Sequence, residues 1–212
     1  GGPVLLRGRT GPHSSLTSPC QKDTMTDTLE DLGSFFDYIW GTEPIRSKDT
    51  YVYLPIKEDD GSERGKWTPF MFAWPRQRAG IIRHVLKWNA TPSLDVFYCP
   101  ALFQFANPAR DNVLGSWVLW VDFDGNAPQD WPEDGDVPPP TLRIQSSIPG
   151  HEHCYWKLSE FLAEPPVLEE RNRALAYLMH ADTSGWDADQ ILRPPFTINR
   201  KRGVEVTVKA WQ

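Results

Sequence analysis

Apolar residues recur at every third or fourth position after Thr28, which is the spacing of one face of an α-helix. Asp27 or Thr28 can cap the start of this helix and Gly41 can end it. The pattern therefore predicts an amphipathic helix that packs on a core. Its apolar face consists of Leu29, Leu32, Phe35, Phe36, Ile39 and Trp40.

Short runs of β-branched and aromatic residues predict strands over 51–56 and 94–99, and the residues between them predict a helix over 80–88. This strand, helix, strand order indicates an α/β layer. A further strand is predicted over 116–124, with Leu119, Val121 and Phe123 facing the core. A long surface loop rich in Pro, Asp and Gly follows over 125–140.

The last third of the chain predicts a hairpin, a helix and a strand. Strand-like runs over 141–146 and 153–158 flank a Pro149-Gly150 turn. Pro165 and Pro166 open a helix that we expect to run to about 181. Val204, Val206 and Val208 alternate as in a final strand. The buried side of the helix is expected to hold Leu168, Leu175, Leu178 and Met179.

A chain of 212 residues that is 40% hydrophobic can bury one sizeable core. We expect residues 1–24, which precede Met25, to be a disordered leader or a cloning remnant, and 25–212 to be one catalytic domain. Within it, 25–110 would be an N-terminal α/β module and 111–212 would carry the motifs. The three cysteines form no CxxC pair, which favours a reducing, cytoplasmic setting. No segment is apolar enough to predict a membrane span.

The net charge of −6 argues against a protein that coats nucleic acid through overall positive charge, so any such contact is local. One basic stretch spans 76–87 and offers Arg83 and Lys87 as candidate DNA-binding residues. Another spans 193–202. For either stretch alone, a solvated charged face is the more common explanation.

Two carboxylates end the strand predicted over 116–124. Strand alternation puts Asp122 and Asp124 on one face, about 7 Å apart. Two such acids repel unless a cation neutralises them, and hard oxygen ligands suit Mg²⁺ or Mn²⁺. The alternative is a strand that ends in an acidic turn, because Asp-Gly is also an ordinary turn signal.

Polar donors surround the predicted hairpin turn. Ser146, Ser147 and His153 could bind a triphosphate through hydroxyls, turn amides and an imidazole, with His151 as the rival histidine. A lone histidine in a strand is more often structural.

A third polar segment follows the predicted last helix. Asp182 comes after that helix and could complete a three-carboxylate metal site, with Asp187 as the alternative. Arg193 and Lys201 could meet phosphate. A solvated loop remains the competing interpretation for Asp187.

Together these elements resemble the archaeo-eukaryotic primase superfamily, specifically the DNA primase-polymerases of phages and plasmids. That family has a strand ending in Asp-x-Asp, a serine-containing hairpin motif ending in His-x-Tyr-Trp, and a further acid ahead of a Leu-Arg-x-Pro-Gly-Thr-x-Asn-x-Lys stretch. One departure is Phe196, which stands where the family has glycine. The matching residues are Asp122, Asp124, Ser146, Ser147, His153, Asp182, Arg193, Asn199 and Lys201.

The resemblance implies a mixed α+β fold, with a catalytic sheet like that of the RNA-recognition motif and a smaller N-terminal α/β module. It implies template-dependent nucleotidyl transfer, as DNA primase and polymerase, with Mg²⁺ or Mn²⁺ on Asp122, Asp124 and Asp182. His153 would be catalytic and contact the triphosphate, together with Ser146, Ser147, Arg193, Asn199 and Lys201.

The implied partners are a single-stranded DNA template, a primer and nucleoside triphosphates, and a helicase is expected in the same full-length chain. We expect this piece alone to be a monomer, in the host cytoplasm if a phage encodes it. Two alternatives remain open. A metal-dependent nuclease would use the same acids, and a non-catalytic module that binds single strands or origins would use the ten tryptophans for stacking.

Overall fold

The computed structural model describes residues 24–43, 45, 50–58, 65–131 and 135–212. Residues 1–23 of the predicted leader over 1–24 lie outside this description, and so do residues 132–134 of the predicted surface loop over 125–140. Thr24, the last residue of the predicted leader, is instead the first residue of α1. The helices are α1 (Thr24–Trp40), α2 (Arg78–Asn89) and α3 (Pro165–Leu178), with a short 3₁₀ helix η1 (Arg110–Asn112). The strands are β1 (Thr50–Tyr53), β2 (Ile56–Glu58), β3 (Lys66–Thr68), β4 (Met71–Trp74), β5 (Leu94–Val96), β6 (Leu102–Phe103), β7 (Val113–Asp124), β8 (Leu142–Gln145), β9 (His151–Leu162), β10 (Ile198–Asn199), β11 (Val204–Glu205) and β12 (Thr207–Trp211).

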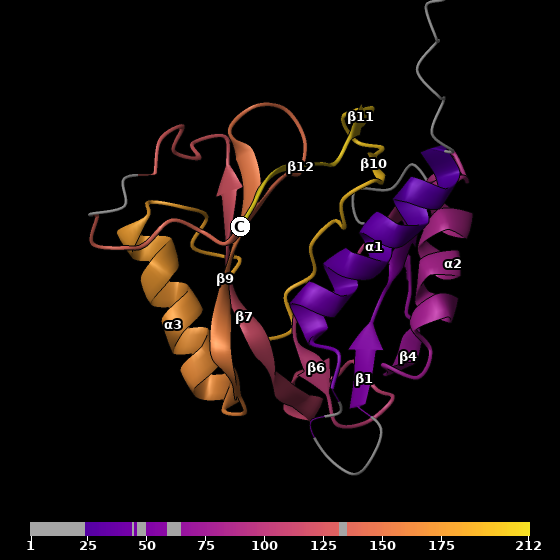
Figure 1. Ribbon diagram of the computed structural model, residues 1–212, viewed down its shortest axis with the longest axis horizontal. Coiled ribbons are helices and arrows are strands. Elements are labelled where there is room, and N and C mark those ends of the chain that lie inside the picture. The colour runs from indigo at the N-terminus through magenta and orange to yellow at the C-terminus, as the bar shows by residue number, and fades with distance from the viewer. Residues whose placement is uncertain (1–23, 44, 46–49, 59–64, 132–134) are drawn as a thin grey trace, which may run out of the picture.

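The fold is mixed α+β and is built on a seven-stranded antiparallel sheet (Figure 1). Its strand order is β12-β8-β9-β7-β6-β1-β4, so it contains strands from both predicted modules. Three further strands form a second sheet in the order β3-β2-β5. No helix in the described part of the chain is both long and apolar enough to cross a bilayer.

The centre of the large sheet is the pair β7 and β9. Helix α3 packs against one side of this pair and α1 against the other (Figure 1). Both faces of β7 are therefore buried: Val121 and Phe123 face a small core next to α3, whereas Val118 and Trp120 face the main core. The sequence predicted the first of these faces and missed the second.

Several predicted elements have different limits in the structure. The run over 51–56 divides at Leu54-Pro55 into β1 and β2, which belong to different sheets. The valine strand divides at Val206, whose backbone pairs with Phe196 and Thr197 instead. Helix α3 ends at Leu178, which is 63% exposed and not buried as predicted.

The backbone has positive φ at Gly150 and at Phe196, which lie in two segments that carry predicted site residues. Gly150, in the β8–β9 turn, has φ of +88°, and a Cβ there would lie 2.5 Å from the Gly125 carbonyl oxygen. Its own carbonyl accepts hydrogen bonds from the amides of Gly125 and Ala127. Phe196 has φ of +62°, so the backbone takes the left-handed conformation that the family's glycine adopts readily.

Candidate active site

Asp122 and Asp124 lie at the end of β7, each opposite a histidine of β9. The register pairs Asp122 with His153 and Asp124 with His151. His153 Nε2 lies 3.7 Å from Asp122 Oδ1, and His151 Nδ1 lies 2.8 Å from Asp124 Oδ1. The predicted rival histidines therefore sit beside different carboxylates on the same sheet face.

The surroundings of Asp122 disfavour its ionised form. Burial, followed by the nearby carboxylates of Asp182 and Asp124, raises the pKa of Asp122 from 3.8 to about 7, although Arg193 acts in the opposite direction. A bound cation would relieve this repulsion.

Asp182 is held directly beside Asp122 by the backbone. Its amide donates a hydrogen bond of 2.9 Å to the Asp122 carbonyl oxygen. The indole of Trp120 donates to the Gly185 carbonyl oxygen at 3.1 Å, which fixes the loop that follows. The Asp182 carboxylate accepts hydrogen bonds from the amide and hydroxyl of Ser184.

Asp187 is directed elsewhere. Its carboxylate lies 3.2 Å from the guanidinium of Arg110, which also contacts Glu169 of α3 at 2.6 Å. The same Glu169 carboxylate accepts from the Ala188 amide at 3.0 Å. The structure thus brings Asp182 to the other acids and ties Asp187 to η1 and α3. Sequence analysis missed Arg110 and Glu169, because no local pattern signals a contact between such distant segments.

His153 is 4% exposed, and Nδ1 of its ring has no hydrogen-bond partner among the described residues. Burial, followed by the charge of Arg193, lowers the pKa of His153 to about 3. The imidazole is therefore neutral at pH 7 and carries one N–H donor.

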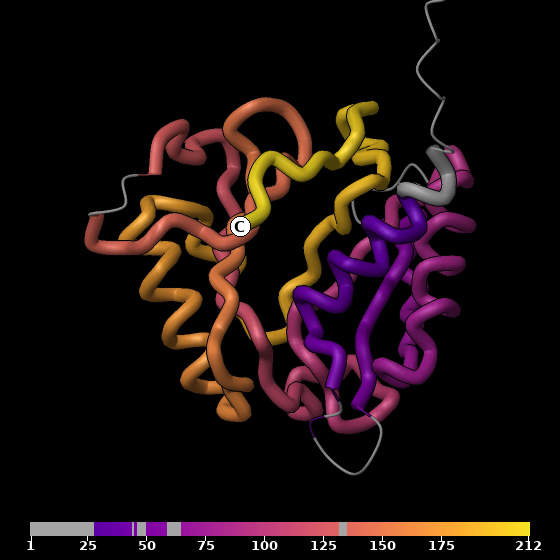
Figure 2. Tube along the Cα trace, in the orientation of Figure 1, coloured from indigo at the N-terminus to yellow at the C-terminus, as the bar shows by residue number. Residues whose placement is uncertain are grey.

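Arg193 comes to this site from the segment after α3, which runs from α3 across the molecule to β10 and β11 (Figure 2). Its guanidinium lies over the ring of Phe97, 4.6 Å from the centroid, and 3.5 Å from Asp95 Oδ2. Its buried Nε has no partner among the described residues. One donor of this half-buried cation is thus left for another acceptor.

The remaining predicted triphosphate residues differ in how closely they join the site. Asn199 is buried and donates to the Ser146 carbonyl oxygen at 2.9 Å, which fastens the hairpin to β10. Ser146 and Ser147 are both buried in the turn that leads to β9. Lys201 is exposed in the turn after β10.

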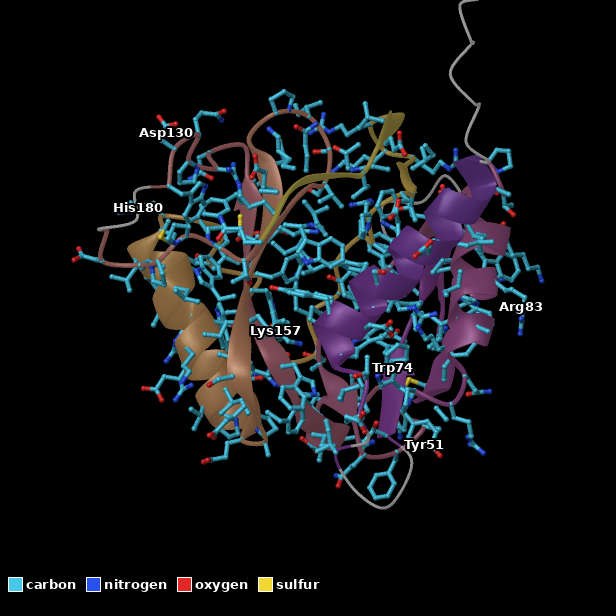
Figure 3. All side chains as sticks on the ribbon, in the orientation of Figure 1. Tyr51, Trp74, Arg83, Asp130, Lys157 and His180 are labelled. Atoms are coloured by element: carbon cyan, nitrogen blue, oxygen red, sulfur yellow. The ribbon has the colours of Figure 1, made fainter. Side chains whose placement is uncertain are left out.

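The predicted DNA-binding residues lie apart from the acids. Arg83 and Lys87 are exposed on α2, and Figure 3 shows Arg83 at the outer edge of the molecule. The amine of Lys87 lies 4.4 Å from the Trp88 ring centroid.

The donor set suits a hard divalent cation, since Asp122, Asp124 and Asp182 supply carboxylate oxygens at one edge. In their present conformations, however, no three acidic, histidine or cysteine side chains of the described residues form a metal-binding group. Instead, the Asp124 carboxylate contacts His151, and the Asp182 carboxylate accepts a hydrogen bond from the Ser184 hydroxyl. A shared ion would therefore have to replace the His151 contact of Asp124 and the Ser184 contacts of Asp182.

Comparison with known proteins rests on structure, because no protein-family model and no curated protein matches the sequence. The catalytic domain of primase RepB' in complex with initiator DNA superposes with a TM-score of 0.62 at 16% identity, over 87% of this chain and 85% of that one. The AEP domain of the cyanophage S-2L primase-polymerase gives 0.56 at 11% identity, over 76% and 81%. The chain has a primase-polymerase fold. This agrees with the predicted resemblance to the archaeo-eukaryotic primase superfamily. A longer primase RepB' structure matches with a TM-score of 0.61 at 15% identity, and this chain spans 56% of its length.

Proposed function

We propose that this chain is the catalytic domain of a DNA primase-polymerase, which joins nucleotides on a single-stranded template. The observation that carries the proposal is the backbone bond that holds Asp182 beside Asp122, opposite the buried neutral His153. A primase-polymerase fold supplies the setting. Replication of a phage or plasmid, in the cytoplasm of the host, is the proposed context.

Asp122, Asp124 and Asp182 would hold Mg²⁺ or Mn²⁺. Bound there, the ions would supply activation of a primer 3′-hydroxyl and stabilisation of the leaving pyrophosphate. The raised pKa of Asp122 supports this assignment, because burial and then the acidic neighbours destabilise the ionised carboxylate, and a bound cation would stabilise it.

His153 and Arg193 would hold the incoming triphosphate. A neutral imidazole could donate its one N–H to a phosphate oxygen in place of its present hydrogen bond with the Arg193 backbone. Because the ring is uncharged, it would not compete with metal ions for the carboxylates. Arg193 has a buried guanidinium N–H without a partner and would add charge-assisted bonds. Ser146, Ser147, Asn199 and Lys201 would complete the phosphate contacts from the turn and from β10.

Arg83 and Lys87 would contact the template backbone at a distance from the chemistry. We further propose that the full-length protein carries a helicase.

A primer-extension assay tests the proposal. The parent protein should lengthen a labelled primer on a single-stranded template when Mg²⁺ or Mn²⁺ is present, and Asp122→Ala should not. Glu160→Ala is the matched control, because Glu160 is an exposed acid at the far end of β9. Shortening of template or primer without extension would instead indicate a nuclease. Equal extension by Asp122→Ala and the parent would refute the assignment of the acids.

A further inference from the structure

A pocket separate from the candidate active site opens between the end of α1 and the strands β7 and β9. It has a volume of ≈ 380 Å³, which lies within the range of small-molecule sites, about 300–1,000 Å³. Tyr38, Gly41 and Glu43 line it from the helix side, and Trp117, Lys157 and Ser159 line it from the strands.

The amine of Lys157 is the main polar group of this pocket. Figure 3 shows Lys157 between β9 and α1. Its Nζ donates to the Tyr38 carbonyl oxygen and lies 5.1 Å from the Tyr38 ring centroid and 5.4 Å from that of Trp117. An ammonium group has three donors, so two remain for a ligand. Burial lowers the pKa of Lys157 to about 8.

A second donor in this pocket also lacks a partner. The indole Nε1 of Trp117 is buried and makes no hydrogen bond among the described residues. A Cβ on Gly41 would lie 2.7 Å from this nitrogen, so only glycine fits against the indole edge at this position. An unsatisfied buried N–H costs free energy, and a ligand acceptor at this point would remove that cost.

Acidic groups lie at the same pocket and disfavour phosphate. Glu43 is exposed at its rim. Asp37 also lines it and forms a bidentate pair with Arg78, at 2.8 Å for both bonds. Aromatic walls, two donors and a carboxylate rim match a planar ring that carries both acceptors and donors, which describes a nucleobase.

The pocket shares a sheet face with the candidate active site. Lys157 lies four residues after His153 on β9, in a regular part of the register with β7. Side chains of a strand alternate between faces, so both project to the same side, about 13 Å apart along the strand.

We propose that this pocket binds one unpaired base of the single-stranded template, stacked on the Trp117 and Tyr38 rings, with acceptors toward Lys157 and the Trp117 indole. This inference rests on the proposed function only in taking the template as the ligand. The sugar and phosphates of that nucleotide lie outside the acidic rim.

Fluorescence anisotropy with two labelled oligonucleotides tests the proposal, one ordinary and single-stranded, the other of equal length with abasic sites throughout. Lys157→Met keeps the aliphatic stem and removes the donors. It should weaken binding of the ordinary oligonucleotide about tenfold, the order expected for loss of one hydrogen bond from a charged donor, and leave the abasic one unchanged. Lys66→Met, at an exposed lysine of β3, should affect both oligonucleotides equally and slightly.

Equal weakening of both oligonucleotides by Lys157→Met would overturn the proposal in favour of a phosphate contact, and no weakening would overturn it as well. Trp117→Phe retains a ring and loses the indole N–H, so it gives an independent variant that should also weaken only the ordinary oligonucleotide. In a protein that already carries Asp122→Ala, adding Lys157→Met should still weaken binding of the ordinary oligonucleotide. The pocket is therefore tested by oligonucleotide binding, whereas the nucleotidyl-transfer proposal is tested by primer extension, and either one can fail without the other.

Discussion

Replacement of Asp122 by asparagine should stabilise the metal-free protein and abolish nucleotide incorporation. The carboxylate at this position is partly buried and lies near Asp182 and Asp124, and these surroundings raise its pKa from 3.8 to about 7. Asparagine has nearly the same shape and no charge. The change therefore removes the repulsion and, under the proposed function, a metal ligand.

The magnitude follows from the pKa. A pKa that rises from 3.8 to about 7 corresponds to about 4 kcal/mol at ~1.4 kcal/mol per tenfold change. The side chain is 27% exposed, and solvent screening reduces this value, so we expect about 1–3 kcal/mol. Because the folded pKa is raised, the contribution of the protonated carboxyl is fully present below about pH 4 and is lost as the pH rises through about 7.

The assay is chemical denaturation in the presence of EDTA at about pH 5 and about pH 8. Relative to the parent, Asp122→Asn should be more stable at the higher pH, and its advantage should shrink at the lower pH. Asp124→Asn is the matched control, because that side chain is 79% exposed and should gain no comparable stability. A variant that is less stable than the parent at both pH values would refute this reasoning.

Three further predictions concern the neighbouring histidines and acids and one buried histidine. His153→Ala should raise the KM for the nucleoside triphosphate about tenfold or more while template binding changes little, and His151→Ala should have the smaller effect; steady-state kinetics beside DNA-binding titrations would reveal the reverse order. Asp182→Asn should reduce metal-dependent extension by about 100-fold or more, whereas Asp187→Asn should mainly lower the melting temperature, and a metal titration of both variants separates these outcomes. Burial lowers the pKa of His84 from 6.5 to about 4, so this residue should reduce the stability of the parent protein as the pH falls below about 6.5. Denaturation of His84→Gln across that pH range should show a weaker loss of stability in acid.

Much of the fold could be predicted because it depends on local patterns. The 3.6-residue period after Thr28 predicted α1, and the Pro149-Gly150 turn predicted the β8–β9 hairpin. The strand that ends in Asp122 and Asp124 was also predicted. In each case the signal lies within one continuous stretch of sequence.

The arrangement of the candidate site depends on contacts between distant segments. His151 and His153 lie on the same strand face, and only the register of β9 against β7 shows which carboxylate each one meets. In the same way, nothing near Asp187 in sequence indicates that Arg110 engages it. Leu178 is exposed at the end of α3, whereas Leu175 and Met179 pack against the small core, so the apolar residues alone did not show which face of the last turn is buried.

The bond from the Asp182 amide to the Asp122 carbonyl oxygen joins two points of the main chain between which a loop, a hairpin and a helix intervene. A main-chain bond does not depend on side-chain identity, so sequence change at either acid leaves the two segments fastened. The intervening surface loop can then vary in length without moving the acids relative to each other. An epitope tag inserted after the exposed Gln129 should therefore be tolerated, and relatives of this protein can differ in this loop while retaining the same spacing of acids.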